Sequence, residues 1–158
     1  MNNKRLSVTG IGPIYVSIIL ITTFILVILE INGKLPRYEI SIHILPIAIG
    51  IIVMVIGAVL WISAVISSKI IKNIKSNVLV TTGVFKYVRN PIYSSFMLVC
   101  TGVLCILNNM ILLIAPVFYW GLMTALLVCT EEKWLRDLYK DEYVEYCKKV
   151  NRCIPMVR

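Results

Sequence analysis

Residues 91–130 read PIYSSFMLVCTGVLCILNNMILLIAPVFYWGLMTALLVCT, a run without a single Asp, Glu, Lys or Arg. A bilayer core takes about 20 apolar helical residues, so this run is roughly twice as long as one membrane span. Asn108 and Asn109, near its middle, supply a turn. The stretch therefore predicts a tight hairpin of two membrane-spanning helices, at about residues 91–107 and 110–129.

Two further spans are predicted on the N-terminal side of this hairpin. Residues 11–31 form one apolar run, in which Glu30 lies near the end and is expected to reach water. Residues 41–67 form another, which contains His43 near its entrance. The chain has 158 residues, of which 59 % are hydrophobic, well outside the range of ordinary soluble domains. We expect an all-α polytopic membrane protein with about four transmembrane helices, as one domain over residues 1–158.

The basic residues predict how the chain is oriented. With the N-terminus inside, 14 of the 16 Lys and Arg residues fall on the inner side, leaving only Lys34 and Arg37 outside. This bias predicts that both termini and the 68–90 loop lie in the cytoplasm. The net charge of +8 needs no nucleic acid, because contact with anionic lipid explains it. Abundant Ile, Lys and Asn with little Ala fit an AT-rich genome, so a bacterial cytoplasmic membrane is expected.

The five cysteines predict neither a disulfide nor a metal site. They form no CxxC pair and their number is odd. Three lie in predicted spans, where cysteine behaves as a small apolar residue, and the others would face a reducing cytoplasm. We therefore expect no metal.

The charged C-terminal part predicts an amphipathic helix at about residues 131–149. Apolar side chains recur there at helical spacing between charges: Leu135, Leu138, Tyr139, Tyr143, Tyr146 and Val150. Such a helix can lie against the membrane face as an anchor, or it can pack over the 68–90 loop. The sequence leaves both alternatives open.

The hairpin predicts where polar chemistry gathers. Asn90-Pro91 begins its first helix and Glu131-Glu132 follows its second, so the two pairs should lie near each other. A helix that starts at Pro91 presents free N–H groups suited to a carboxylate. Glu131 or Glu132 could hold a hydroxyl or an ammonium group. A zwitterionic ligand with an aromatic ring would fit, between flat walls from Phe85, Tyr87 and Tyr93.

Several separated motifs carry a family resemblance over about residues 78–158. They are Thr82-Gly83-Val84-Phe85, Arg89-Asn90-Pro91-Ile92-Tyr93, Glu131-Glu132, Glu142-Tyr143 with Tyr146, and Arg152 before Pro155. In content and order this half of the chain resembles the isoprenylcysteine carboxyl methyltransferases and the related phospholipid methyltransferases of membranes.

The resemblance implies S-adenosylmethionine as methyl donor, bound by about residues 77–158. The donor contacts that it implies are Leu79, Val80, Phe85, Asn90, Pro91, Ile92, Tyr93 and Glu131. The sequence departs from the family pattern at two positions. Asn90 replaces the usual His; it keeps a donor and an acceptor but cannot become charged. Leu127 stands where the eukaryotic carboxyl methyltransferases carry a substrate-binding Arg, which argues against a prenylated-cysteine substrate.

The expected reaction needs mainly alignment and exclusion of water, because the sulfonium is already an activated donor. Arg89 is expected to orient an acidic acceptor or, equally, to pair with lipid phosphate. Glu132 could help to deprotonate an amine acceptor. The resemblance implies methyl transfer at the cytoplasmic membrane face to a lipophilic acceptor, the carboxylate of an isoprenylcysteine-like molecule or another lipid. A phospholipid N-methyltransferase, a small four-span transporter and a sterol-reductase-like binder of a nicotinamide dinucleotide are the alternatives.

Overall fold

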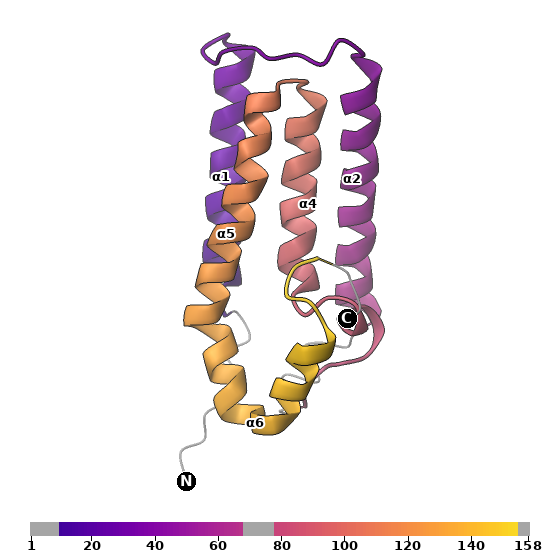
Figure 1. The fold of residues 1–158 in the computed structure, drawn as a ribbon, viewed down its shortest axis with the longest axis vertical. Helices are drawn as coiled ribbons and strands as arrows, with labels where there is room; N and C mark the ends of the chain where they lie inside the picture. Colours follow the sequence, from indigo (N-terminus) through magenta and orange to yellow (C-terminus); the bar gives the residue numbers. More distant parts are fainter. Residues whose placement is uncertain (1–9, 68–77, 155–158) are drawn as a thin grey trace.

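Four helices form an elongated bundle, and the C-terminal helix folds back at one end of it (Figure 1). The structure is a computed structural model that describes residues 10–67 and 78–154. The long elements are α1 (Gly12–Ile31), α2 (Ile44–Ile62), α4 (Pro91–Ile106), α5 (Ile114–Cys129) and α6 (Glu131–Lys149). A π-helical turn, η1 (Ser63–Ser67), extends α2, and the short 3-10 turns are η2 (Gly83–Lys86) and η3 (Met110–Leu113).

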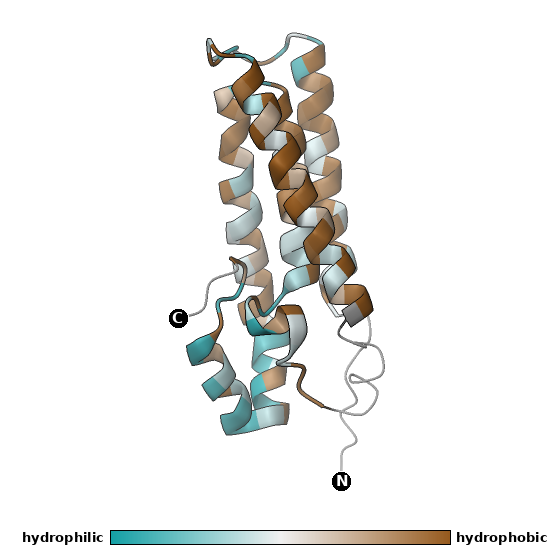
Figure 2. Ribbon diagram, turned by 90° about the vertical axis from the view of Figure 1, so that its right-hand side faces the viewer, coloured by the Kyte–Doolittle hydropathy of each residue, from teal (hydrophilic) through white to brown (hydrophobic). Residues whose placement is uncertain are grey.

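The predicted all-α membrane architecture is confirmed. Three helical stretches are long and apolar enough to cross a bilayer: Gly12–Ile31, Ile44–Ile66 and Met110–Cys129. The fourth, α4, is apolar but shorter, at 16 residues. Hydrophobic residues cover the bundle, whereas hydrophilic residues gather on α6 (Figure 2). The first part of the 68–90 loop, up to residue 77, lies outside the described residues.

Glycines let α2 and α4 pack closely. A Cβ atom added at Gly102 would lie 2.5 Å from the carbonyl oxygen of Gly50, and one at Gly57 would lie 2.9 Å from that of Ser95. Both approaches are closer than real Cβ atoms make. Small residues at such crossings are a usual device of membrane helices, which gain little from apolar burial and much from close contact.

The core of the bundle lies between α1, α4 and α5. Its fully buried side chains include Tyr15, Ile19, Leu104 and Tyr119. The Tyr119 hydroxyl is 2.8 Å from the Thr23 hydroxyl, so one polar group in this apolar core satisfies another.

Glu30 is buried, contrary to the expectation that it reaches water. Its side chain is 5 % exposed, and it accepts a 2.7 Å hydrogen bond from the Asn109 side-chain amide. The Arg37 guanidinium lies 3.4 Å from the same carboxylate. The loop after α1 folds over the helix end, which sequence spacing does not reveal. The predicted turn at Asn108 is present, with a positive φ of 49°.

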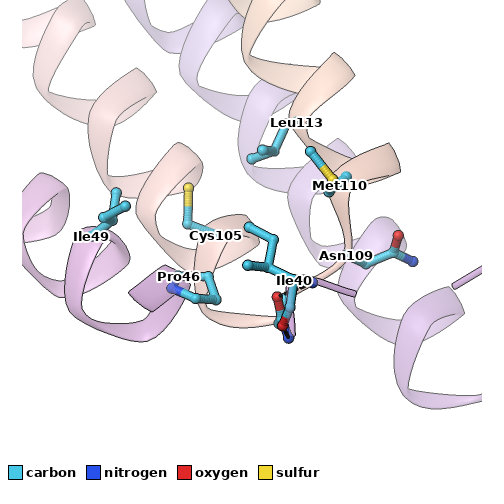
Figure 3. Close-up of a pocket in the computed structure, with 8 residues that line it drawn as sticks. Ile40, Pro46, Ile49, Cys105, Asn109, Met110 and Leu113 are labelled. Atoms are coloured by element: carbon cyan, nitrogen blue, oxygen red, sulfur yellow. Dashed lines mark hydrogen bonds between the residues drawn. The ribbon is translucent and has the colours of Figure 1, made fainter. Parts of the chain in front are cut away.

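A mostly apolar cavity lies beneath this loop, lined by α2, the end of α4 and η3 (Figure 3). Its lining includes Ile40, Pro46, Ile49, Cys105, Met110 and Leu113. The loop is at the end of the bundle opposite α6 (Figure 1), so this cavity is separate from the region where the predicted site residues gather.

Candidate functional site

The C-terminal helix packs over the turn that precedes α4, which is one of the two placements left open by the sequence. The Tyr146 hydroxyl donates a 2.6 Å hydrogen bond to the carbonyl oxygen of Phe85. Leu79 packs against the buried cluster of Tyr143, Tyr146 and Val150. Within the described part of the chain, the second half of α6 therefore packs against residues 79–90.

A sharp kink allows α6 to make this contact. Lys140 has φ 47° and ψ −123°, conformations outside the helical region, and the helix reverses direction there. Figure 1 shows α6 descending from α5 and then returning toward the bundle. The sequence predicts the limits of this helix, residues 131–149, but not the kink.

After α6, the chain runs beside the start of α4. The amide of Arg89 donates to the carbonyl oxygen of Asn151 at 2.9 Å, and the amide of Asn90 donates to that of Arg152 at 3.2 Å. The Asn90 side chain donates to the same Arg152 oxygen at 3.1 Å. Asn90 therefore occupies the N-cap position of α4 without its side chain capping the helix.

Glu132 lies at the centre of a buried charge cluster. Its side chain is 3 % exposed, and Arg152 contacts both carboxylate oxygens. Arg89 Nη2 lies 3.4 Å from Glu132 Oε1, and the other end of its guanidinium reaches the Tyr143 hydroxyl at 3.5 Å and the Cys147 sulfur. Arg89 was expected to contact an acidic acceptor or a lipid phosphate. In the structure its guanidinium instead contacts groups of the protein itself.

The cluster changes the proton affinity of its members. Burial raises the pKa of Glu132, but the hydrogen bond from Arg152 and the charge of Arg89 outweigh it, so the pKa falls below the usual range. The hydrogen bond to Glu132 raises the pKa of Arg152. A carboxylate with a lowered pKa is a weaker base, and this one is already engaged by two guanidinium groups.

Glu131 makes a second and different set of contacts. Its Oε1 accepts the Tyr93 hydroxyl at 2.8 Å and the backbone amide of Ile11 at 2.7 Å. Tyr93 also meets Tyr15 edge to face, at 5.9 Å between ring centroids. The contact with the start of α1 was not predicted, because it joins positions 120 residues apart.

The remaining residues that were predicted to contact the methyl donor lie at the same end of the bundle. Phe85 and Pro91 are buried, whereas Val80 and Ile92 are half-buried. Two polar atoms here are buried without a hydrogen-bond partner in the described part of the chain: Arg89 Nε and Ser94 Oγ. Buried polar groups normally find partners, so these two atoms are exceptions beside the predicted site. Leu127, by contrast, is packed in the core and 1 % exposed.

Residues 45–142 match the phospholipid methyltransferase family. The chain belongs to this family. The match covers α2, the turn before α4, the hairpin and the first part of α6, including Arg89, Tyr93, Glu131 and Glu132. The family resemblance read from the motifs is thereby confirmed.

Three relatives are each named protein-S-isoprenylcysteine O-methyltransferase. Those of Schizosaccharomyces pombe and Saccharomyces cerevisiae are 33 % and 34 % identical over 54 % and 57 % of this chain, and 36 % and 38 % of their own lengths. The form B relative of Arabidopsis thaliana is 30 % identical over 68 % of this chain and 58 % of its own. The aligned region thus spans about a third to just over half of these relatives. No solved structure matches the chain.

Proposed function

We propose that this protein transfers a methyl group from S-adenosylmethionine to a lipophilic acceptor at the membrane face beside α6. The observation that carries the proposal is the meeting of the turn at 85–93, the Glu131-Glu132 pair and the segment at 150–153 at one end of the bundle. These are the segments in which the family motifs lie, although they are far apart in sequence. The family match and the names of the three relatives support the same reaction.

The groups at this end suit the chemistry of the donor. S-adenosylmethionine supplies a methyl group already activated on a sulfonium, together with a carboxylate and an ammonium group. The first turn of α4 lacks a side-chain cap, and Pro91 has no N–H, so the amides of Ile92 and Tyr93 are the ones left for a carboxylate. Glu131, half-buried and close to Tyr93, offers a carboxylate for a hydroxyl or cationic group. Leu79, Val80 and Ile92 supply apolar surface.

Arg89 and Glu132 are assigned a positioning role within this proposal. Their ion pair, closed by Arg152, fixes the segment at 89–90 against the tail and so fixes the start of α4. Catalysis then depends on alignment of donor and acceptor and on exclusion of water. A carboxylate acceptor needs no base, whereas an amine acceptor must lose a proton.

The acceptor is proposed to be a lipid or a lipid-modified molecule that enters from the bilayer. The relatives' names indicate methylation of an oxygen on an isoprenylcysteine, and the family description indicates a phospholipid. Leu127 in the apolar core supplies no charge for an acidic acceptor, which favours other lipids. We further propose that the α6 end faces the cytoplasm, because most of the described Lys and Arg residues lie at that end and Lys34 and Arg37 lie at the other. The composition of the chain supports a bacterial cell.

Calorimetric titration of the purified protein in nanodiscs with S-adenosylmethionine tests the donor. Saturable binding that is strongly weakened in Glu131→Ala and kept in Glu145→Ala is expected. Glu145 is a matched control because it lies on the exposed surface of α6 and pairs there with Lys148. NADPH serves as the comparison ligand. Absence of donor binding by a folded, monodisperse sample would refute the methyltransferase proposal and favour a transporter, or a reductase if NADPH binds.

Transfer of a labelled methyl group then tests the acceptor. Nanodiscs containing phosphatidylethanolamine are compared with nanodiscs to which N-acetyl-S-farnesylcysteine is added. Label in the phospholipid identifies N-methylation. Label in the farnesylcysteine identifies a carboxyl methyl ester if hydrolysis in base releases the labelled methyl group. Label in neither, despite donor binding, would mean that another lipid is the acceptor.

A further inference from the structure

The start of α1 is tied to the proposed donor site through one oxygen of Glu131. Oε1 accepts both the Ile11 amide, at 2.7 Å, and the Tyr93 hydroxyl, at 2.8 Å. Within residues 10–67 and 78–154, Oε2 has no hydrogen-bond partner. Within the described part of the chain, the carboxylate is therefore held through one oxygen only.

Two glycines make this approach possible. Gly10 has a positive φ of 44°, and a Cβ atom there would overlap the carboxylate of Glu131. A Cβ atom at Gly12 would lie 2.7 Å from Cε1 of the Tyr93 ring. Side chains at either position would push the turn away from the two residues that it contacts. The turn Gly10-Ile11-Gly12 is thus shaped around Glu131 and Tyr93.

The contact joins two helix N-termini. Glu131 is the first residue of α6, and Ile11 occupies the N-cap position of α1. The carboxylate accepts the N–H of the N-cap residue itself, the bond that a Glu three residues later makes in a capping box, here from the other half of the chain. Both helix ends carry partial positive charge, which holds the carboxylate between them.

We propose that the Gly10-Ile11-Gly12 turn is a positioning element of the methyl-donor site, which aims the free oxygen of Glu131 at the donor. The inference rests on the proposed function and deepens it, because it brings the first span into a site otherwise built from residues 79–152. It assigns a role to a segment that lies outside the family match at 45–142.

Donor binding by variants of this turn tests the proposal. Ile11→Pro removes the donating N–H and puts the ring Cδ where the Glu131 oxygen accepts it, so the carboxylate is displaced from the turn. The backbone itself tolerates the change, because φ of Ile11 is −84° and proline prefers about −65°. Ile11→Val keeps the N–H and is the matched control. We expect Ile11→Pro to raise the Kd for S-adenosylmethionine about tenfold, and Ile11→Val to leave it unchanged.

A second variant, with its control, disturbs the close approach of the turn to Tyr93 instead of the hydrogen bond to Glu131. Gly12→Ala should raise the Kd, whereas Gly121→Ala, whose Cβ would meet nothing within 4 Å, should not. Gly12→Ala decides the question if Ile11→Pro does not fold. In a Glu131→Ala background, with affinity measured by competition at high donor concentration, Ile11→Pro should add at most about a twofold effect, since the turn acts through Glu131.

The outcomes separate this inference from the proposed function. If the wild-type protein does not bind the donor, both fail. If it binds and Glu131→Ala loses affinity, but Ile11→Pro and Gly12→Ala behave as their controls do, only the positioning role is overturned. Additive losses in the double variant would also overturn it, because they would mean that the turn merely supports the fold.

Discussion

Arg152 holds both carboxylate oxygens of Glu132, with Nη2 3.0 Å from Oε2 and Nε in contact with Oε1. The two residues lie before and after the reversal of α6 at Lys140, so their ion pair closes the loop that this reversal makes. Arg89 approaches Glu132 Oε1 from the turn before α4. One buried carboxylate thereby joins three segments that are separate in sequence.

Removal of that carboxylate should destabilise the protein strongly. Glu132→Ala leaves two guanidinium groups without their partner, and breaking a buried pair in this way typically costs about 3–5 kcal/mol. Arg152→Lys should cost less but still be measurable, since an ammonium group cannot contact both oxygens. Thermal unfolding in detergent measures both. Glu145→Ala is the control, and an equal effect in all three variants would contradict the central role of Glu132.

The stability should fall in acid through the same group. The pKa of Glu132 is lower in the folded protein than in the unfolded chain. The contribution of Glu132 to the free energy of unfolding is therefore fully present above its pKa in the unfolded chain, about 4.3. It is lost as the pH falls through its lower pKa in the folded protein. Unfolding midpoints measured between pH 7 and pH 3 should fall less steeply in Glu132→Gln than in wild type. Parallel curves would show that other groups dominate acid unfolding.

Gly102→Ala should destabilise the bundle, because the added methyl would lie 2.5 Å from the Gly50 carbonyl oxygen. Such overpacking typically costs about 1–3 kcal/mol. Gly121→Ala meets open space and should be neutral or stabilising, since alanine favours helix over glycine by about 1 kcal/mol. Thermal unfolding of the two variants side by side compares them. If both substitutions changed the stability in the same direction, α2 and α4 would not be closely packed.

Asn109→Ala should reduce stability without affecting donor binding. The Asn109 amide donates to Glu30 and to the carbonyl oxygen of Pro36, and its loss leaves a buried carboxylate with one partner fewer. A cost of about 1–3 kcal/mol is expected. The residue lies at the end of the bundle away from α6, so the Kd for S-adenosylmethionine should match that of wild type. A weaker Kd would indicate coupling along the bundle.

Leu127→Arg should lower the yield of folded protein. The side chain is 1 % exposed among Tyr15, Met123 and Cys153, so an arginine there would be buried without a partner. A loss of about 4 kcal/mol is expected, as for other unpaired buried charges. Leu127→Met, similar in volume, is the control. Normal folding of the arginine variant would mean that this position can open toward the membrane or a ligand.

The sequence predicts the spans and their limits well because each depends on local composition. Residues 110–129 form a continuous apolar helical stretch, η3 followed by α5, and the predicted helix at 131–149 has the observed bounds. Motif order also indicated which residues gather at one end. Three features escaped prediction: the kink at Lys140, the burial of Glu30 and the contact of Ile11 with Glu131. Each depends on a partner distant in the chain. A Gly-x-Gly pattern before the first span was the visible signal for the last.

By itself, the sequence determined the class of the protein, since uncharged runs of bilayer length must form helices that satisfy their own backbone in lipid. It also determined which residue types stand near the polar end of the hairpin. Only the tertiary structure decided their partners. Two adjacent glutamates point to different neighbours, Glu131 to the start of α1 and Glu132 to two arginines. Neighbouring helical residues project about 100° apart, and the segments packed on each side decide what each one meets.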